Sequence, residues 1–185
     1  MRVIDLNPED ATAIQQAAAI LNAAFREHWP DAWVTLEEAE AEVREMLTPG
    51  RICRVAVDEV EGGAVVGWVG GIPEYDGRVW ELHPLAVRPD RQRAGLGRLL
   101  VRDFEAQVKA RGGLTIMLGS DDVDDMTSLA NANLYENLPE KIATIRNFKD
   151  HPYTFYQKLG YTILGVMPDA NGRGKPDIYL GKRVG

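Results

Sequence analysis

The sequence predicts a three-layer domain of the α/β (α+β) class, in which helices cover a central sheet. Two helical patterns precede a series of apolar β segments, a long amphipathic pattern follows them, and shorter β and helical segments close the chain. The 185 residues are 45% hydrophobic and 26% charged, which suits a chain that folds around one core. Because no repeat or linker interrupts the pattern, we expect a single domain over residues 1–185.

The first two predicted helices have recognisable starts. Residues 7–10, Asn-Pro-Glu-Asp, are typical of a helix N-terminus with Asn7 as the cap. Thr35 and Glu38 form a capping box that opens a second helix, which extends through Leu47. The residues of the first helix expected to face the core recur at helical spacing: Ile14, Ala18, Leu21 and Phe25.

The middle of the chain predicts a β meander followed by a helix. Strands are expected at 52–57, 65–72 and 79–87, with Pro84 interrupting the third. The helix that follows carries an apolar stripe and ends at Gly112. That stripe consists of Leu96, Leu100, Phe104 and Val108. The later elements are a strand at 114–118, loops and short helices over 120–147, a helix at 152–159, and strands at 161–166 and near 177–180.

Composition narrows the class of protein. The net charge of −7 disfavours nucleic acid as a partner and favours a basic ligand. The single cysteine excludes an internal disulfide and any Cys-x-x-Cys metal or redox motif. No run approaches the roughly 18 apolar residues of a membrane helix, and residues 1–10 lack the apolar core of a signal peptide. We therefore expect a cytoplasmic protein that binds neither membrane nor metal.

Residues 88–97 join the third strand to the third helix and are predicted to bind a phosphate. Gly95 and Gly97 allow a ligand to approach the backbone, and the helix N-terminus provides free N–H groups. Residues 88–102 contain five arginines and only one aspartate, and this excess of positive charge favours a pyrophosphate as the ligand. The alternative is an ordinary solvated basic turn.

Pro84 breaks the strand that leads into this segment. Proline cannot donate to a β ladder, so a bulge or a splayed edge is expected at Pro84. The N–H groups of Leu85 and Val87 can then point toward a ligand and stabilise the oxyanion formed at a thioester. An ordinary edge strand that ends at Pro84 is the alternative.

Several of these segments resemble the GNAT acetyltransferase superfamily. Residues 92–97, Gln-Arg-Ala-Gly-Leu-Gly, resemble its acyl-CoA-binding motif, and residues 155–161, Phe-Tyr-Gln-Lys-Leu-Gly-Tyr, resemble its second motif at the usual separation. Residues 80–85, 112–116, 118–122 and 168–172 are similar to the aminoglycoside 6'-N-acetyltransferases of the enterococcal chromosomal type. The resemblance, from about Trp29 to Lys182, implies a GNAT-like domain whose central mixed sheet is splayed at the acetyl-CoA site.

The resemblance implies a homodimeric enzyme that uses acetyl-CoA. Its product is an aminoglycoside acetylated on the 6'-amine, formed by direct attack on the thioester, and this activity confers antibiotic resistance. The cofactor-binding residues that it implies are Leu85, Ala86, Val87, Gln92, Arg93, Ala94, Gly95, Leu96, Gly97, Arg98, Tyr156 and Lys158.

Four residues are candidates for the chemical step. Glu81 is the candidate base or the carboxylate that positions the amine, and on a strand it shares a face with His83. His83 either relays the proton or holds the structure beside Pro84. Tyr156 occupies the family's general-acid position, and Leu85 supplies the oxyanion donor. A surface carboxylate is the alternative for Glu81, and Tyr153 and Tyr161 compete with Tyr156 on composition alone.

A polycationic acceptor needs an acidic site. Aspartates cluster over residues 121–125, and a solvated acidic loop is the alternative interpretation. Aromatic side chains provide flat walls for sugar rings, although on composition alone a tryptophan such as Trp29 is more often a core residue. The predicted substrate-binding residues are Trp29, Tyr75, Glu81, Asp121, Asp124 and Glu136.

Two other functions stay open on the sequence. The acceptor amine can belong to a polyamine, a peptide or a protein, which a panel of acceptors would distinguish. A non-catalytic acyl-CoA-binding module is the other, and the presence of both Glu81 and Tyr156 argues against it.

Overall fold

The computed structural model describes residues 1–185, which form two compact units. The first comprises Met1–Ile116 with Val184–Gly185, and the second comprises Met117–Arg183. The elements of the first unit are β1 (Arg2–Asp5), α1 (Ala11–Phe25), α2 (Leu36–Met46), β2 (Ile52–Asp58), β3 (Ala64–Glu74), β4 (Val79–Val87) and α3 (Leu96–Ala110). β5 (Thr115–Asp121) continues into the second unit, which adds α4 (Leu138–Ala143), α5 (Tyr153–Lys158), β6 (Thr162–Met167) and β7 (Asp177–Arg183). The prediction of an α/β class is confirmed.

The strands form one mixed sheet of seven strands in the order β1-β2-β3-β4-β5-β7-β6. Each neighbouring pair from β1 to β4 is antiparallel. At the start of β5, the amides of Leu114 and Thr115 both donate to the carbonyl oxygen of Arg78, at 2.8 and 3.2 Å. In the second unit, β6 and β7 pair antiparallel from Thr162↔Gly181 to Met167↔Asp177.

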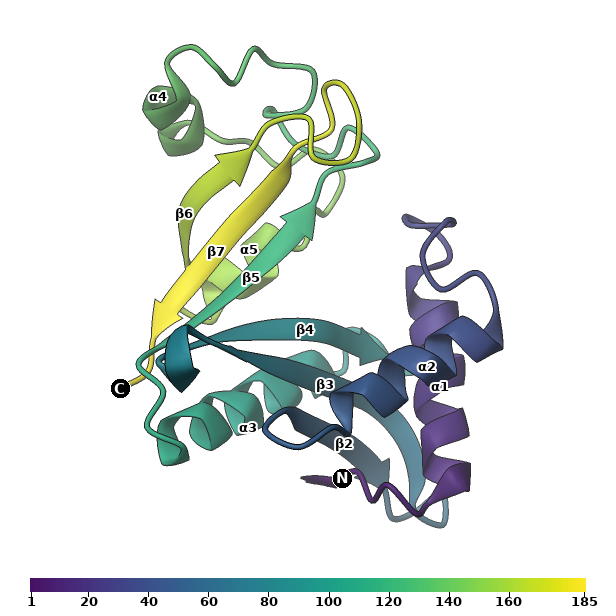
Figure 1. Ribbon diagram of the computed structural model, residues 1–185. Helices are drawn as coiled ribbons and strands as arrows, with labels where there is room; N and C mark the ends of the chain where they lie inside the picture. Colours follow the sequence, from purple (N-terminus) through teal and green to yellow (C-terminus); the bar gives the residue numbers. More distant parts are fainter. The chain divides into compact units, whose positions relative to one another are not determined.

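Helices cover both faces of the sheet in the first unit (Figure 1). Two neighbouring glycines of β3 show which helix lies on which face, because successive Cβ positions of a strand point to opposite faces. A Cβ on Gly70 would lie 2.9 Å from Cγ of Met46 in α2, whereas a Cβ on Gly71 would collide with the ring of Phe104 in α3. Thus α2 packs on one face with α1, and α3 packs on the other, which gives three layers.

The stripe predicted for the third helix is confirmed. Leu96, Leu100, Phe104 and Val108 are all buried in α3, and Gly112 and Gly113 follow the helix as expected. The capping box that opens α2 is also present, because Thr35 accepts a bond from the Glu38 amide and the Glu38 carboxylate accepts one from the Thr35 amide. Both features depend on neighbours in sequence, which explains why spacing alone predicts them.

The N-terminal segment differs from the prediction. α1 begins at Ala11 with Asp10 as its cap, whereas Asn7 accepts a bond from the Glu9 amide in the preceding turn. Of the predicted core residues of α1, Ile14, Ala18 and Leu21 are buried and Phe25 is only half-buried. The preceding strand, β1, was not expected, because its four residues carry too short a pattern to recognise.

A buried arginine fastens β1 to the rest of the first unit. Arg54 of β2 lies 2.7 Å from the Asp5 carboxylate of β1 and makes a bidentate pair with Asp103 of α3 at 2.7 and 3.1 Å. The guanidinium matches a carboxylate with two parallel N–H bonds, so this pairing is directional as well as charged. It connects β1, β2 and α3.

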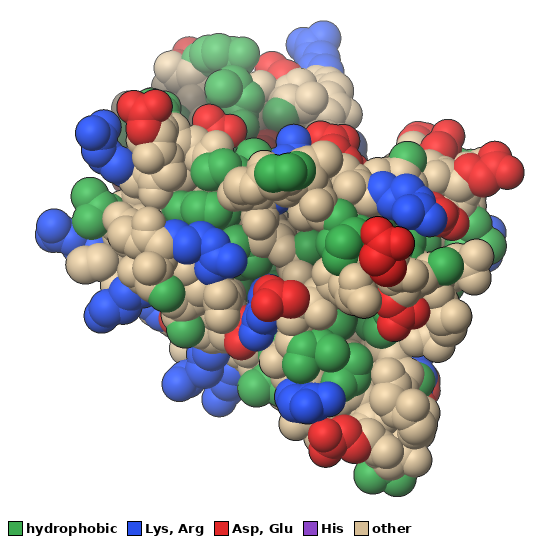
Figure 2. All heavy atoms as spheres, turned by 60° about the horizontal axis from the view of Figure 1, so that its bottom comes forward, with side chains coloured by type: hydrophobic (Ala, Val, Ile, Leu, Met, Phe, Trp, Pro, Cys, Tyr) green, Lys and Arg blue, Asp and Glu red, His purple; other side chains and the backbone are tan.

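Boundaries in the second unit shift by one or more residues from the prediction. β5 extends to Asp121, and β7 extends to Arg183. The segment expected as loops and short helices contains one helix, α4, and an isolated bridge between Thr127 and Asn147. No helix in the structure combines the length and apolar character needed to cross a bilayer. Side chains of both charge signs are interspersed with hydrophobic ones on the face shown in Figure 2.

Candidate active site

The predicted break at Pro84 is a bulge in β4. Val69 of β3 pairs with Leu85 and Gly71 pairs with Leu82, so Gly70 alone faces the two residues His83 and Pro84. The His83–Pro84 peptide is cis. The prediction of a bulge is confirmed, while the alternative of an edge strand is wrong because β4 lies between β3 and β5 in the sheet order.

The bulge precedes two amides that point away from β3. The Arg88 amide donates to the Val66 carbonyl of β3 at 3.0 Å. Successive N–H groups of a strand alternate in direction, so the Ala86 amide points toward β3 as well. The amides of Leu85 and Val87 therefore point to the other side of β4, the orientation that an oxyanion donor requires.

Glu81 and His83 share the partly exposed face of β4, as predicted, and Leu82 is buried on the other face. Nε2 of His83 lies 3.6 Å from a carboxylate oxygen of Glu42 in α2. The same carboxylate accepts a 3.3 Å bond from the indole nitrogen of Trp33, whose ring centroid lies 6.0 Å from that of His83. The structure thus groups His83 with an acid and an aromatic residue that sequence reasoning missed.

Nothing in the sequence pattern could have identified Glu42 or Trp33. Glu42 lies between the exposed Ala41 and the buried Val43 of an amphipathic helix, and Trp33 lies in the connection between α1 and α2. The φ of Trp33 is +49°, and its carbonyl accepts a 2.7 Å bond from the side chain of Asn22. A local backbone conformation and a contact from α1 together place this indole beside β4.

The predicted phosphate loop lies between β4 and α3. The Gln92 side chain donates to the Val87 carbonyl at 3.3 Å, which holds the loop against the end of β4. Gly95 has φ +89°, a left-handed conformation that favours glycine, and it immediately precedes α3. No side chain caps this helix start, and the first backbone bond into Gly95 comes from Leu99. The amides of the first turn of α3 are therefore available to an anion, together with the local dipole.

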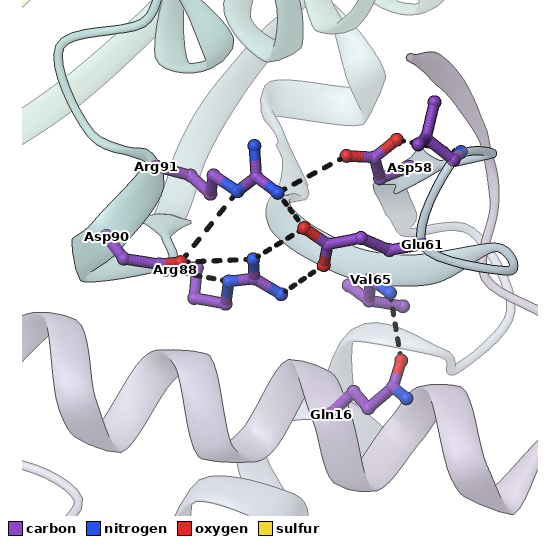
Figure 3. A network of polar contacts seen from close by, with 8 residues as sticks. Gln16, Asp58, Glu61, Val65, Arg88, Asp90 and Arg91 are labelled. Atoms are coloured by element: carbon purple, nitrogen blue, oxygen red, sulfur yellow. Dashed lines mark hydrogen bonds and ion pairs between the residues drawn. The ribbon is translucent and has the colours of Figure 1, made fainter.

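The basic charge of this loop is smaller than its sequence suggests (Figure 3). Arg88 pairs with Glu61 at 3.0 Å and with Asp90 at 2.7 Å, and Arg91 pairs with Glu61 and lies 3.6 Å from Asp58. Two arginines thus face three carboxylates, and they tie the loop to the turn between β2 and β3. The positive charge that the sequence assigns to Arg88 and Arg91 is therefore largely neutralised by these carboxylates.

The acidic segment after β5 contains carboxylates in different situations. Asp122 is fully buried and accepts bonds from the amides of Met126 and Thr127 at 2.7 and 2.9 Å, so it holds the loop. Asp125 pairs with Lys175 at 2.8 Å, and this bond lowers the pKa of its carboxyl. Asp124 and Glu136 are exposed, and Asp121 is half-buried with a 2.5 Å bond from Asn171.

Tyr156 lies in α5 and is buried. Burial raises the pKa of its phenol well above the ordinary value near 10, so the group keeps its proton throughout the physiological range. Its ring packs against Phe155 and Tyr161, with centroids 5.0 and 5.6 Å away. Lys158, two residues later, is exposed.

The predicted aromatic walls lie in different parts of the first unit. Trp29 follows α1 and packs against Phe25 and His28, with ring centroids 5.6 and 5.7 Å apart. Tyr75 is 73% exposed in the turn between β3 and β4. Tyr75 is thus accessible to a ligand, whereas the Trp29 ring is largely engaged with its neighbours.

A covalent route through Cys53 has little support. The thiol is buried in β2, and burial raises its pKa to about 12. A nucleophilic cysteine needs a thiolate, which a pKa this high suppresses at neutral pH. No group of three or more His, Cys, Asp or Glu residues is arranged to hold a metal ion.

A bulged strand followed by a glycine turn and an uncapped helix N-terminus is suited to an acyl thioester joined to a diphosphate. The sequence model of the acetyltransferase (GNAT) family matches residues 14–138. The chain belongs to this family.

Among solved structures, an aminoglycoside 6'-N-acetyltransferase complexed with coenzyme A is 40% identical, with 100% of this chain and 97% of that chain covered and a TM-score of 0.90. The aminoglycoside 6'-N-acetyltransferase from Enterococcus faecium is also 40% identical, with the same coverage and a TM-score of 0.88. An aminoglycoside 6'-acetyltransferase of type Ii is 35% identical over 100% of this chain and 97% of that chain, with a TM-score of 0.74. No curated protein sequence gives a significant match.

Proposed function

We propose that this protein transfers the acetyl group of acetyl-CoA to the 6'-amine of aminoglycosides. The observation that carries the proposal is the 40% identity, over the whole chain, to an aminoglycoside 6'-N-acetyltransferase complexed with coenzyme A. The bulge in β4, the outward amides of Leu85 and Val87 and the uncapped start of α3 suit the thioester and diphosphate of that cofactor.

The reaction starts with the amine, which is protonated at neutral pH and cannot attack until it loses a proton. Glu81 accepts that proton, directly or through water, or holds the amine in place, and His83 lies on the same face of β4. The amine then attacks the thioester carbon, and the Leu85 amide stabilises the oxyanion. Collapse of the intermediate breaks the C–S bond, and the Tyr156 phenol protonates the departing thiolate. The nitrogen loses its second proton as it becomes an amide, and that proton returns to the Tyr156 phenolate, directly or through water.

The cofactor and the acceptor use opposite charges. The backbone of Gln92–Gly97, with Ala86, Arg98 and Lys158, holds coenzyme A. The carboxylates of Asp121, Asp124 and Glu136 attract the ammonium groups of the aminoglycoside, with Trp29 and Tyr75 beside its rings. We further propose that the enzyme is cytoplasmic and works as a homodimer, which light scattering on the purified protein would test.

A single acceptor screen tests the function. The purified protein is incubated with acetyl-CoA and kanamycin or tobramycin, thiol release is followed spectroscopically, and NMR locates the acetyl group on the product. Acetylation at the 6'-amine is expected. Turnover no higher than the amine-free blank with every aminoglycoside, or turnover only with polyamines or peptides, would refute the proposed acceptor.

Replacing Tyr156 with phenylalanine is expected to lower kcat about tenfold and to leave the KM for acetyl-CoA unchanged. General-acid catalysis is typically worth about 10²–10⁴-fold. The loss here is smaller, because a thiol with a pKa near 8.5 is a fair leaving group even without protonation. Tyr161→Phe, which keeps its ring beside Tyr156, serves as the control. An unchanged kcat in Tyr156→Phe would exclude the acid role.

Replacing Asp124 with asparagine is expected to raise the aminoglycoside KM about three- to tenfold, with little change in the KM for acetyl-CoA. The substitution removes one charge that attracts an ammonium group and preserves the shape of the side chain. Asp125→Asn is the matched control, because its carboxylate already pairs with Lys175 and bonds Asn131. Equal shifts in the two Michaelis constants of Asp124→Asn would contradict a role in acceptor binding.

A further inference from the structure

His151 is a fully buried imidazole between the end of β5 and the start of α5. Its Nε2 lies 3.0 Å from the carbonyl oxygen of Asp121, the last residue of β5. Its Nδ1 accepts a 3.2 Å bond from the amide of Tyr153, the first residue of α5. One side chain therefore connects the strand that ends at a predicted acceptor-binding residue with the helix that carries Tyr156.

The two contacts determine the tautomer of the ring. An amide N–H can only donate, so Nδ1 must offer its lone pair to Tyr153. A carbonyl oxygen can only accept, so Nε2 must carry the hydrogen that reaches Asp121. His151 is thus the neutral Nε2–H tautomer, in which each ring nitrogen serves a different segment.

The backbone of His151 is held as firmly as its ring. The Asn147 side chain accepts a 2.8 Å bond from the His151 amide and donates a 2.9 Å bond to the His151 carbonyl. Asn147 also forms the bridge to Thr127, whose amide bonds the buried carboxylate of Asp122. Since the imidazole can shift little, it fixes the positions of the Asp121 carbonyl and the Tyr153 amide, which it bonds.

We propose that His151 is a positioning residue that orients both the acceptor-binding end of β5 and the helix of the general acid. The inference rests on the proposed function and assigns no direct contact with substrate to His151. The Nε2–H bond holds the backbone of Asp121, whose carboxylate also accepts a bond from Asn171. The Nδ1 bond anchors the first turn of α5, three residues before Tyr156.

Two substitutions separate these roles. In His151→Asn, the amide oxygen lies where Nδ1 was, so it can accept from Tyr153 but cannot reach Asp121. In His151→Gln, the longer side chain brings its NH₂ group to where Nε2 was, so it can donate to Asp121 but leaves the Tyr153 amide without this acceptor. Each variant keeps one of the two hydrogen bonds.

The kinetic constants are expected to split accordingly. His151→Asn raises the KM for kanamycin about three- to tenfold and keeps kcat within about twofold, as the loss of one hydrogen bond implies. His151→Gln lowers the single-turnover rate of acetyl transfer about three- to tenfold and keeps the KM for kanamycin within about twofold. The control is Thr154→Val, a substitution at the same helix start. It removes a hydroxyl that accepts a bond from the Asn147 side chain and donates one to the His151 carbonyl. It is expected to cause no such split.

Two NMR measurements test the inference without any turnover. Long-range ¹H–¹⁵N spectra of the native protein should show His151 as the Nε2–H tautomer. The Tyr153 amide should resist hydrogen exchange in the native protein and in His151→Asn but exchange at least about tenfold faster in His151→Gln. If the native protein fails to acetylate kanamycin, the proposed function fails, and these spectra still decide the positioning role.

Three results would overturn the inference. The first is an Nδ1–H tautomer in the native protein. The second is a Tyr153 amide equally protected in both variants. The third is a pair of variants that change the same kinetic constant by the same factor. If neither variant folds, the two measurements on the native protein test the inference: an Nε2–H tautomer of His151 with a protected Tyr153 amide supports it, and any other result overturns it.

Discussion

Replacing Glu81 with glutamine is expected to lower kcat/KM for kanamycin about 100-fold at pH 7, within the range for loss of a general base. Glutamine keeps the size of the side chain but cannot accept the proton of the 6'-ammonium group. The deficit should narrow as the pH rises, because a larger fraction of the amine is then already free. Steady-state rates between pH 6 and 9 measure both effects.

Glu74→Gln provides the matched control for this experiment. Glu74 is an exposed carboxylate at the end of the neighbouring strand β3, so its loss changes the net charge by the same amount. It pairs with Val79, whereas Glu81 pairs with Ile72, so it lies on the same face as Glu81 but two residues further along the strand. Its rate should stay within about twofold of the native value. A Glu81→Gln enzyme that matches this control at every pH would show that Glu81 neither takes the proton nor positions the amine.

Replacing Gly70 with alanine is expected to destabilise the protein by about 3 kcal/mol and to disturb the bulge. Its Cβ would collide with the carbonyl oxygen of His83 and lie 2.9 Å from Cγ of Met46. Overpacking usually costs about 1–3 kcal/mol, and the upper end applies here because the obstructing carbonyl is backbone and cannot rotate away. Thermal denaturation should show a decrease in Tm of about 6–12 °C.

Gly165→Ala is the matched control for the packing effect. Gly165 also lies in a strand, β6, but nothing lies within 4 Å of the position of its Cβ. This substitution should leave Tm within about 2 °C of the native value. A Gly70→Ala protein as stable as this control, with unchanged kinetics, would show that the close approach of β3 to the bulge is not needed.

The sequence predicted most of the fold because the signals involved are local. The stripe of α3 and the capping box of α2 each depend on residues within a few positions of one another. β1 was missed because its four residues have little pattern, and a long-range contact from Arg54 holds it in place. The start of α1 was misplaced because Asn7 and Asp10 are both good caps, and only the second is used.

The candidate site was predictable only in part. The bulge at Pro84 followed from the chemistry of proline, and the uncapped start of α3 followed from Gly95. The placement of Glu42 and Trp33 beside His83 had no signal in the spacing of residues. The roles of Glu81 and Tyr156 stay predictions, since they derive from a family resemblance and await the experiments above.

The sequence by itself determined most of the helices and strands, and it predicted the segment whose backbone amides bind a phosphate. Propensity, capping and glycine conformation act over a few residues, so they can be read along the chain. Only the tertiary structure decided which arginines of the loop before α3 are paired with carboxylates, and which partner each ring nitrogen of His151 has. Arg88 pairs with Glu61, which is 27 residues away in the sequence, and His151 bonds Asp121, which is 30 residues away. No periodicity encodes such pairs, because they arise when packing brings distant segments together.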